Sequence, residues 1–344
     1  MLGDAKVEQE SPGSSPALAD VGVVAIGRNE GDRLKACLAA ARRDASAVIY
    51  VDSGSTDGSR DWAREQGIEV IELDMEAPFT AARARNAGWR RLAEIAPDAA
   101  FVQVVDGDCE LVEGFLADAR GAFDSADRLA AVCGQRRERY PDRTRYNRLC
   151  SLEWEAPAGP SASCGGDAMF RLGALRQVGG FDPTLIAGEE PELCFRLRQR
   201  GWKILRLGRD MALHDADMTR LRQWWQRARR GGHAAAEGAW MHGRSPERYN
   251  VRRTATILLW ALVLPLLILG LAWPTGGWSL LGLGLYPVQW LRIVGKELRR
   301  GRSGGDARLV ATFTLLGKFP QLAGVVSFVV DRVRGRRAEL IEYK

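Results

Sequence analysis

The stretch AFVQVVDGDCEL, residues 100–111, decides the fold that we predict for this chain. Its apolar run, residues 100–106, leads directly into a polar turn that carries Asp106 and Asp108. Such a run is typical of a strand buried on both faces of a sheet, with its carboxyl end open to a ligand. Two earlier apolar runs, residues 21–26 and 47–52, are each followed by a helical pattern. This alternation predicts an α/β fold, with a mainly parallel sheet and flanking helices.

The remaining predicted elements extend the same pattern toward the C-terminus. Further strands are expected at residues 68–73, 129–135 and 203–208, and helices at residues 27–43, 57–67, 79–96 and 192–201. Residues 1–20 are acidic, rich in Ser, Pro and Gly, and have no apolar core, so we expect a disordered tail and not a signal peptide. The six cysteines have no CxxC or zinc-knuckle spacing, which suggests neither a disulfide framework nor a metal knuckle and fits a reducing cytosol.

The back of the chain is basic and strongly apolar. The formal net charge is +6, yet residues 254–291 contain no Asp, Glu, Lys or Arg. Positive charge that flanks an apolar stretch argues against a nucleic-acid-binding protein and for a membrane segment. Residues 254–273 and 278–294 predict a transmembrane hairpin with basic cytoplasmic ends, although a buried hairpin in a soluble protein is the alternative. Because Lys318 and Pro320 interrupt residues 309–330, we expect that segment to be re-entrant or interfacial.

Two polar loops follow predicted strands. In VDSGSTDGS, residues 51–59, Asp52 stands at a strand end where a carboxylate can bind a nucleobase or ribose, while Asp57 serves a ligand or caps the next helix. In VVDGDCEL, residues 104–111, Asp106 and Asp108 suit Mg²⁺ or Mn²⁺, with an ordinary turn as the alternative.

Three further features could complete a site. In GEEPELCFRLRQRG, residues 188–201, Pro191 predicts a helix start that leaves Glu189 and Glu190 as candidate general bases, or as carboxylates that merely complement the helix dipole. His214 follows a predicted strand and is a candidate third metal ligand, although a lone histidine is more often structural. The basic helix RQWWQRARRGG, residues 222–232, could close over a diphosphate or lie on anionic lipid.

Taken in order, these motifs resemble the family-2 glycosyltransferases of the GT-A fold over residues 21–240. VVAIGRNEG (23–31) resembles the opening strand and nucleotide loop of that family's Rossmann-like half, and VDSGSTDGS its second nucleotide loop. ARARNAG (82–88) resembles the following helix, VVDGDCEL the metal loop, GGDAMFRLGALRQVGGFDPTL (165–185) the acceptor-side segment, and GEEPELCFRLRQRG the start of the catalytic helix. The chain departs from the family at Ile26, Gly27 and Arg28, and by having Glu where the base is more often Asp.

The resemblance implies an inverting, metal-dependent sugar transfer with assigned residues. The implied nucleotide-sugar contacts are Gly27, Glu30, Asp52, Asp57, Arg85 and Asp106, and the implied metal ligands for Mg²⁺ or Mn²⁺ are Asp108 and His214. Glu190 is the first choice for the base, with Glu189 and Glu192 in reserve, and Trp225 and Arg229 form a lid over the diphosphate.

The resemblance and the apolar segments together predict a cytoplasmic catalytic domain on a multi-pass protein of the inner membrane. We expect residues 241–253 to be a basic linker, residues 254–294 the transmembrane hairpin, and residues 295–344 a basic loop, interfacial helix and tail. The implied partners are a nucleotide-sugar donor, a lipid-linked or glycan acceptor and membrane lipids, without nucleic acid. The alternatives are a sugar-1-phosphate nucleotidyltransferase, for which GRNEG (27–31) is a poor phosphate loop, and a non-catalytic membrane scaffold.

Overall fold

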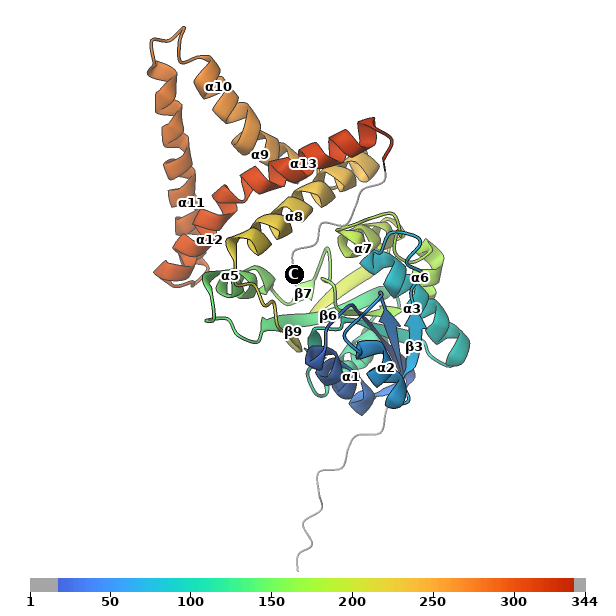
Figure 1. The fold of residues 1–344 in the computed structure, drawn as a ribbon. Helices are drawn as coiled ribbons and strands as arrows, with labels where there is room; N and C mark the ends of the chain where they lie inside the picture. Colours follow the sequence, from blue (N-terminus) through green and yellow to red (C-terminus); the bar gives the residue numbers. More distant parts are fainter. Residues whose placement is uncertain (1–17, 337–344) are drawn as a thin grey trace, which may run out of the picture.

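The structure is a computed structural model that describes residues 18–336 (Figure 1). Its centre is a nine-stranded mixed sheet with the order β3-β2-β1-β4-β8-β6-β9-β5, and β7 pairs with β9 at one side. The strands are β1 (Leu18–Gly27), β2 (Ala45–Asp52), β3 (Glu69–Glu72), β4 (Phe101–Asp106), β5 (Cys109–Leu111), β6 (Leu129–Glu138), β7 (Gly159–Pro160), β8 (Ala168–Arg171) and β9 (Lys203–His214). The predicted α/β class is confirmed.

The first half of the sheet is parallel, as the apolar runs predict. Strand β1 pairs in parallel with β2 and β4, and β2 pairs in parallel with β3. Strand β8 then runs antiparallel to both β4 and β6, while β6 and β9 are parallel to each other. Because Ile26 pairs with Asp106 across β1 and β4, the loops after these two strands open at the same edge of the sheet.

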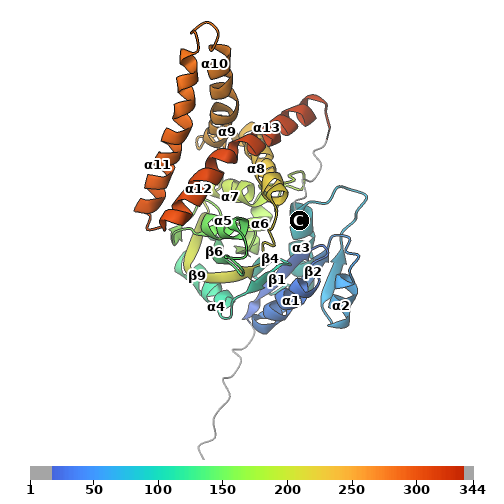
Figure 2. The ribbon, with the colours of Figure 1, turned by 60° about the vertical axis from the view of Figure 1, so that its left-hand side comes forward.

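Helices cover both faces of this sheet and bury a large apolar core between the layers (Figures 1 and 2). They are α1 (Asp32–Asp44), α2 (Ser59–Glu65), α3 (Ala81–Ile95), α4 (Phe115–Ala122), α5 (Arg145–Trp154), α6 (Leu172–Val178) and α7 (Glu189–Gln199), with a 3₁₀ turn at Phe123–Ser125. Helix α3 packs so closely on the sheet that a Cβ at Gly88 would overlap Val24. The core fixes the strand ends, and therefore the loops that follow them.

The long helix α8 (Leu221–His242) joins the sheet domain to a C-terminal helical module. The module contains α9 (Val251–Leu258), a π-helical turn (Leu259–Val263), α10 (Leu264–Gly270), a 3₁₀ turn (Trp278–Gly284), α11 (Leu285–Arg299), α12 (Gly304–Leu316) and α13 (Lys318–Val333). Helices α10 and α11 form a hairpin that projects away from the sheet, whereas α13 lies along α8 in both views (Figures 1 and 2).

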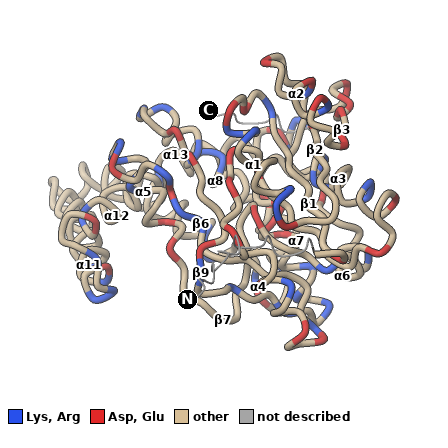
Figure 3. The backbone as a smooth tube through the Cα atoms, turned by 90° about the horizontal axis from the view of Figure 1, so that it is seen from below, with Lys and Arg blue, Asp and Glu red and all other residues tan. Residues whose placement is uncertain are grey.

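Exposed apolar side chains distinguish the hairpin from the sheet domain. Leu266, Leu269 and Trp273 are each more than 60% exposed, and so are Trp278 and Leu281. In Figure 3, charged residues are spread over the sheet domain, and blue segments mark the end of α11.

Two helices are long and apolar enough to cross a membrane by length and composition, namely Val251–Gly270 and Gly304–Val333. The first matches the first half of the predicted hairpin. The second contains the segment that we expected to be interfacial, and residues 278–294 form shorter helical pieces instead.

Two predicted boundaries were wrong. Strand β1 starts at Leu18, so the predicted tail of residues 1–20 is too long, and its remainder lies outside the described residues, as does the end of the predicted C-terminal tail. The basic linker predicted at residues 241–253 is also shorter, because α8 runs to His242 and α9 begins at Val251, which leaves residues 243–250 between them.

Candidate functional site

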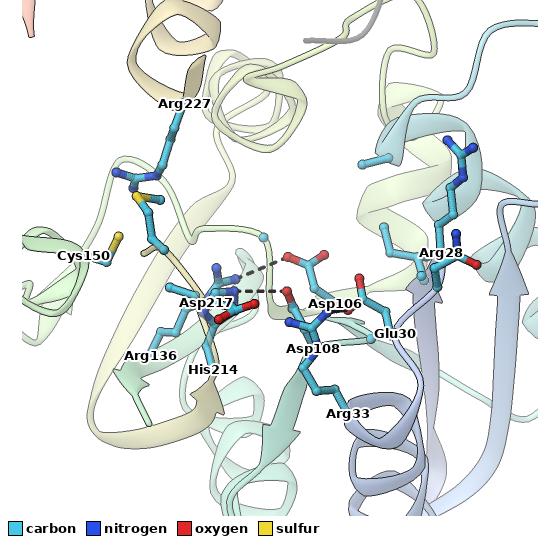
Figure 4. Close-up of a pocket in the computed structure, with 18 of the residues that line it drawn as sticks. Arg28, Glu30, Arg33, Asp106, Asp108, Arg136, Cys150, His214, Asp217 and Arg227 are labelled. Carbon is cyan, nitrogen blue, oxygen red and sulfur yellow. Dashed lines mark ion pairs between the residues drawn. The ribbon is translucent and has the colours of Figure 1, made fainter. Parts of the chain in front are cut away.

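A cavity of about 650 Å³ lies where the loops after β1 and β4 meet the end of β9 and the start of α8. Its lining is mostly polar and charged. The charged and imidazole side chains that line it are Arg28, Glu30, Arg33, Arg85, Asp106, Asp108, Arg136, Glu189, His214, Asp217, Arg227 and Arg230. Figure 4 shows several of them converging from opposite walls. Of the predicted site residues, the structure brings Gly27, Glu30, Arg85, Asp106, Asp108, Glu189 and His214 together here.

Asp108 and His214 face each other across this cavity (Figure 4). Strands β5 and β9 are antiparallel and pair Cys109 with His214, which brings the histidine opposite the turn that carries Asp108. Asp108 Oδ2 lies 3.4 Å from His214 Nε2, and both residues are buried. One ligand atom each from Asp108, Cys109 and His214 fits within a 4.8 Å group. A carboxylate and an imidazole are suitable ligands for Mn²⁺, so the residues present fit the predicted divalent cation.

Glu138, at the end of β6, orients His214 and was missed by the sequence analysis. Its Oε2 lies 3.8 Å from His214 Nδ1 and accepts a hydrogen bond from the Ala216 amide at 3.1 Å. Its Oε1 accepts one from Asn147 Nδ2 at 2.9 Å. Burial raises the pKa of Glu138, but the neighbouring His214 and hydrogen bonds from Asn147 and from the amides of Tyr140 and Ala216 outweigh it and hold the pKa below its ordinary value. Glu138 therefore stays ionised behind the imidazole, as expected of a carboxylate that supports a metal-binding histidine.

Two arginines pair with carboxylates at the cavity, namely Arg85, which is buried, and Arg136, which is partly exposed. Arg85, in α3, donates to Asp106 Oδ1 at 2.7 Å and also contacts Glu189 Oε1. Arg136, in β6, lies 2.7 Å from Asp167 Oδ2 and 3.7 Å from Asp106 Oδ2. Although burial opposes the charged form, the neighbouring carboxylates raise the pKa of both guanidiniums. The cavity therefore carries two permanent positive charges beside its acidic groups. Arg136 belongs to none of the motifs quoted above, whereas Asp167 lies in the segment at residues 165–185 that resembles the acceptor side.

The first nucleotide loop reaches the cavity, whereas the second supports it from outside. Gly27 and Glu30 line the cavity, and Asn29, which has φ 56°, accepts a hydrogen bond from the Thr56 amide at 2.7 Å. Asp52 is buried, and it accepts hydrogen bonds from Tyr50 Oη at 2.8 Å and from the amides of residues 54 and 55.

Asp57 accepts hydrogen bonds from the amides of Gly31 and Ser59, each at 3.0 Å. Neither Asp52 nor Asp57 lines the cavity. As nucleotide contacts both stay predictions, and in the structure their oxygens shape and join the two loops.

Only one of the two adjacent glutamates at the start of α7 lines the cavity. Glu189 lines the cavity and pairs with Arg85. Glu190 points elsewhere: its Oε1 accepts hydrogen bonds from the Cys164 amide at 2.5 Å and from Cys194 Sγ at 2.9 Å. Glu192, the other reserve residue, pairs with Arg196 at 2.7 Å and with His242 at 2.8 Å. Of the two glutamates predicted as candidate bases, only Glu189 lines the cavity.

Neither of the predicted lid residues on α8, Trp225 and Arg229, lines the cavity. Trp225 is 42% exposed, and Arg229 Nη2 lies 3.4 Å from Ser327 Oγ on α13. Gln223, Arg227 and Arg230 line the cavity instead, because their spacing of four and three residues places them on one face of the helix. The predicted basic helix over the cavity is therefore present, with other residues on its inner face.

Residues 23–162 match the family model Glycosyl transferase family 2. A pre-mycofactocin glycosyltransferase of Mycobacterium tuberculosis is 32% identical over 257 residues, which cover 70% of this chain and 52% of that protein. The succinoglycan biosynthesis protein ExoA of Rhizobium meliloti is 27% identical over 169 residues, covering 46% of this chain and 50% of its own. The chain thus spans about half the length of these curated relatives.

A mannosyltransferase from Pyrobaculum calidifontis, solved in complex with GDP-Man and Mn²⁺, has a similar fold. Its TM-score is 0.59 at 19% identity, over 91% of this chain and 88% of that chain. At this identity the likeness concerns the fold alone, and it agrees with the sheet and cavity described above. With the relatives and the order of the motifs in agreement, residues 23–162 form a domain of glycosyl transferase family 2.

Proposed function

We propose that this protein is an inverting glycosyltransferase that moves a sugar from a nucleotide-diphosphate donor to an acceptor hydroxyl. The observation that carries the proposal is that the Asp108–His214 pair and the Arg85–Glu189 pair line the same cavity. The family match of residues 23–162 supports the reaction class. The P. calidifontis neighbour, solved with GDP-Man and Mn²⁺, supports the class of donor.

Asp108 and His214 would hold the divalent cation, Mn²⁺ or Mg²⁺, with Glu138 fixing the imidazole behind it. When bound, such an ion neutralises negative charge on a departing diphosphate. On the donor side, Gly27 and Glu30 offer the nucleoside a wall of the cavity, and Asp106 offers a carboxylate that Arg85 holds in place. Arg227 and Arg230 reach the cavity from α8, where guanidinium groups suit diphosphate oxygens.

Glu189 is the group that we assign as general base. Its carboxylate accepts the proton of the acceptor hydroxyl as the acceptor oxygen bonds to the anomeric carbon, while the bond from that carbon to the diphosphate breaks. Arg85 keeps Glu189 beside Asp106 and so fixes the direction from which the acceptor approaches. Attack on the face opposite the leaving diphosphate inverts the anomeric carbon.

The C-terminal module supports a membrane location, and we propose that the exposed hairpin inserts into the cytoplasmic leaflet of the inner membrane. Its apolar side chains have no protein partner large enough to cover them among the described residues, and Trp273 is 94% exposed. Helix α13 instead packs along α8, and another face of α8 lines the cavity. We therefore propose that α12 and α13 lie at the membrane surface. A site held against lipid favours a lipid-linked or membrane-emerging glycan acceptor.

The test uses the full chain in detergent or nanodiscs, a panel of nucleotide-sugars and Mn²⁺. We expect release of nucleoside diphosphate with one donor, abolished in Asp108→Ala protein that keeps its thermal unfolding transition. Unchanged turnover in excess chelator would refute the metal-dependent reaction. Formation of nucleotide-sugar and pyrophosphate from a nucleoside triphosphate and a sugar-1-phosphate would instead identify a nucleotidyltransferase. Failure of every donor to bind or react would favour the scaffold.

A further inference from the structure

Three cysteines that are far apart in the sequence come together behind the catalytic wall. Cys133 lies in β6, Cys164 in the loop before β8, and Cys194 in α7. All three are buried free thiols, and the carboxylate of Glu190, 4% exposed, lies among them. This cluster is separate from the cavity, since none of the four residues lines it. Their separations of about thirty residues explain why no short spacing motif marks them.

The sulfur–sulfur distance within the cluster suits a tetrahedral metal ion, and the carboxylate lies within hydrogen-bonding distance of one of the two thiols. Cys164 Sγ lies 3.8 Å from Cys194 Sγ, and Cys194 Sγ lies 2.9 Å from Glu190 Oε1. With zinc–sulfur bonds of about 2.3 Å, two thiolates at a tetrahedral angle are about 3.8 Å apart. One ligand atom each from Cys164, Glu190 and Cys194 fits within a 4.8 Å group. A disulfide would need the sulfurs at about 2.05 Å, so it fits these positions less well.

We propose that Cys164, Cys194 and Glu190 form a structural site for Zn²⁺. Thiolate sulfur selects Zn²⁺ over Mg²⁺ and Mn²⁺, which prefer oxygen ligands, so this site and the Asp108–His214 pair would take different ions. When the ion binds, each thiol that becomes a ligand releases one proton to solvent, and no change of oxidation state occurs. Because the ligands are buried, the ion would enter as the chain folds.

The site would join parts of the chain that are far apart in the sequence. It links the loop at residues 156–167 to the first turn of α7. Glu189 precedes Glu190 in that same turn, so a bound ion would fix the backbone that carries the proposed base. Zinc is thus expected to stabilise the fold and the position of Glu189 without entering the reaction.

The test measures metal content and ligand type in the full-length protein. Protein expressed with zinc and purified without chelator should contain one zinc per chain by elemental analysis, and Co²⁺ in its place should give a strong thiolate charge-transfer band in the near ultraviolet. Cys164→Ser and Cys194→Ser should each abolish the band and lower the unfolding temperature. Cys109→Ser is the matched control, since Cys109 lies beside Asp108 and His214, and it should retain the band.

Three outcomes would overturn the proposal. The first is protein that contains no zinc and gives no cobalt–thiolate band, and the second is a band that is lost in Cys109→Ser but kept in Cys194→Ser. The third is a thiol count, in denaturant without reductant, that is two lower than the six cysteines of the sequence. The last result would identify a disulfide. If the serine variants do not fold, the wild-type protein still decides, because removal of zinc by a strong chelator should make the buried thiols reactive. Thiol reactivity that is unchanged by the chelator contradicts the site.

Discussion

Replacing Glu189 by Gln tests the central assignment of the cavity, and Glu190→Gln is its comparison on the neighbouring residue. The two side chains are adjacent in sequence, yet only Glu189 lines the cavity. Glutamine keeps the shape of the side chain and removes its ability to take a proton. Loss of a general base costs about 10²–10⁴ in turnover. At about 1.36 kcal/mol per tenfold, this equals a barrier increase of about 2.7–5.4 kcal/mol.

The structure also limits the damage to folding. Arg85 loses one anionic partner in Glu189→Gln but keeps Asp106 at 2.7 Å, so its charge stays paired. The stability cost should therefore remain below the roughly 3–5 kcal/mol of breaking an isolated buried ion pair. Glu190→Gln has the opposite profile, because Glu190 receives hydrogen bonds from the Cys164 amide and the Cys194 thiol and faces away from the cavity. Its main effect should be on stability.

The assay follows nucleoside diphosphate release at saturating donor and acceptor, with folded protein quantified from thermal unfolding. Glu189→Gln should lower kcat at least about a hundredfold while donor KM changes by a few-fold. Per folded molecule, Glu190→Gln should lose far less. A larger loss of kcat in Glu190→Gln than in Glu189→Gln would refute the assignment.

Three further perturbations test other parts of the molecule. Glu138→Gln should raise the Mn²⁺ concentration needed for half-maximal activity by about 10–100-fold, because the carboxylate orients His214, and an unchanged metal dependence would contradict this role. Arg227→Ala should raise donor KM more than Arg229→Ala does, since only Arg227 lines the cavity; equal effects would argue against the orientation of α8. Burial raises the pKa of Glu237 to about 7 from 4.5, so the folded state keeps a proton that the unfolded state loses, and stability falls as pH rises through this range. Between pH 5 and pH 8 the free energy of unfolding of the wild type, measured with urea, should fall by up to about 3 kcal/mol from this cause, and Glu237→Gln should remove that fall. Parallel pH profiles of stability for the wild type and the variant would refute the prediction.

The strands and the first ligands of the site could be predicted because both depend on local pattern. Residues 100–111 contain a buried strand and the carboxylates that follow it, and parallel strands bring such loops to one edge of the sheet. Asp106, Asp108 and His214 were found in this way. Glu138 was not, because its meeting with His214 depends on the register in which β6 pairs with β9. A register between strands that are distant in sequence is not visible in either segment alone.

Which residues of a helix reach the cavity could not be predicted, for a different physical reason. Successive residues of an α-helix point about 100° apart, so one residue decides between the cavity and the core. Glu189 and Glu190 differ by this rotation, and so do Arg229 and Arg230. The sequence pattern placed both helices beside the predicted site. It could not give the rotation of each helix about its own axis, because this depends on what packs behind the helix. For α8 that partner is α13, where a Cβ at Gly232 would overlap the backbone of Gln321.

Helix α8 thereby connects the membrane module to the cavity. One of its faces places Gln223, Arg227 and Arg230 over the cavity, and another packs against α13 through glycine contacts too close to allow sliding. The module is also tied to α5 by the Arg148–Asp306 pair at 2.6 Å. Removing residues 254–344 would take away α13 and this pair together, and so would release the arginines over the cavity as well as the hairpin. Loss of donor hydrolysis in such a truncation would report the position of α8, and the role of the membrane must be tested instead by changing the exposed apolar side chains of α10, such as Leu266 and Leu269, while α13 stays in place.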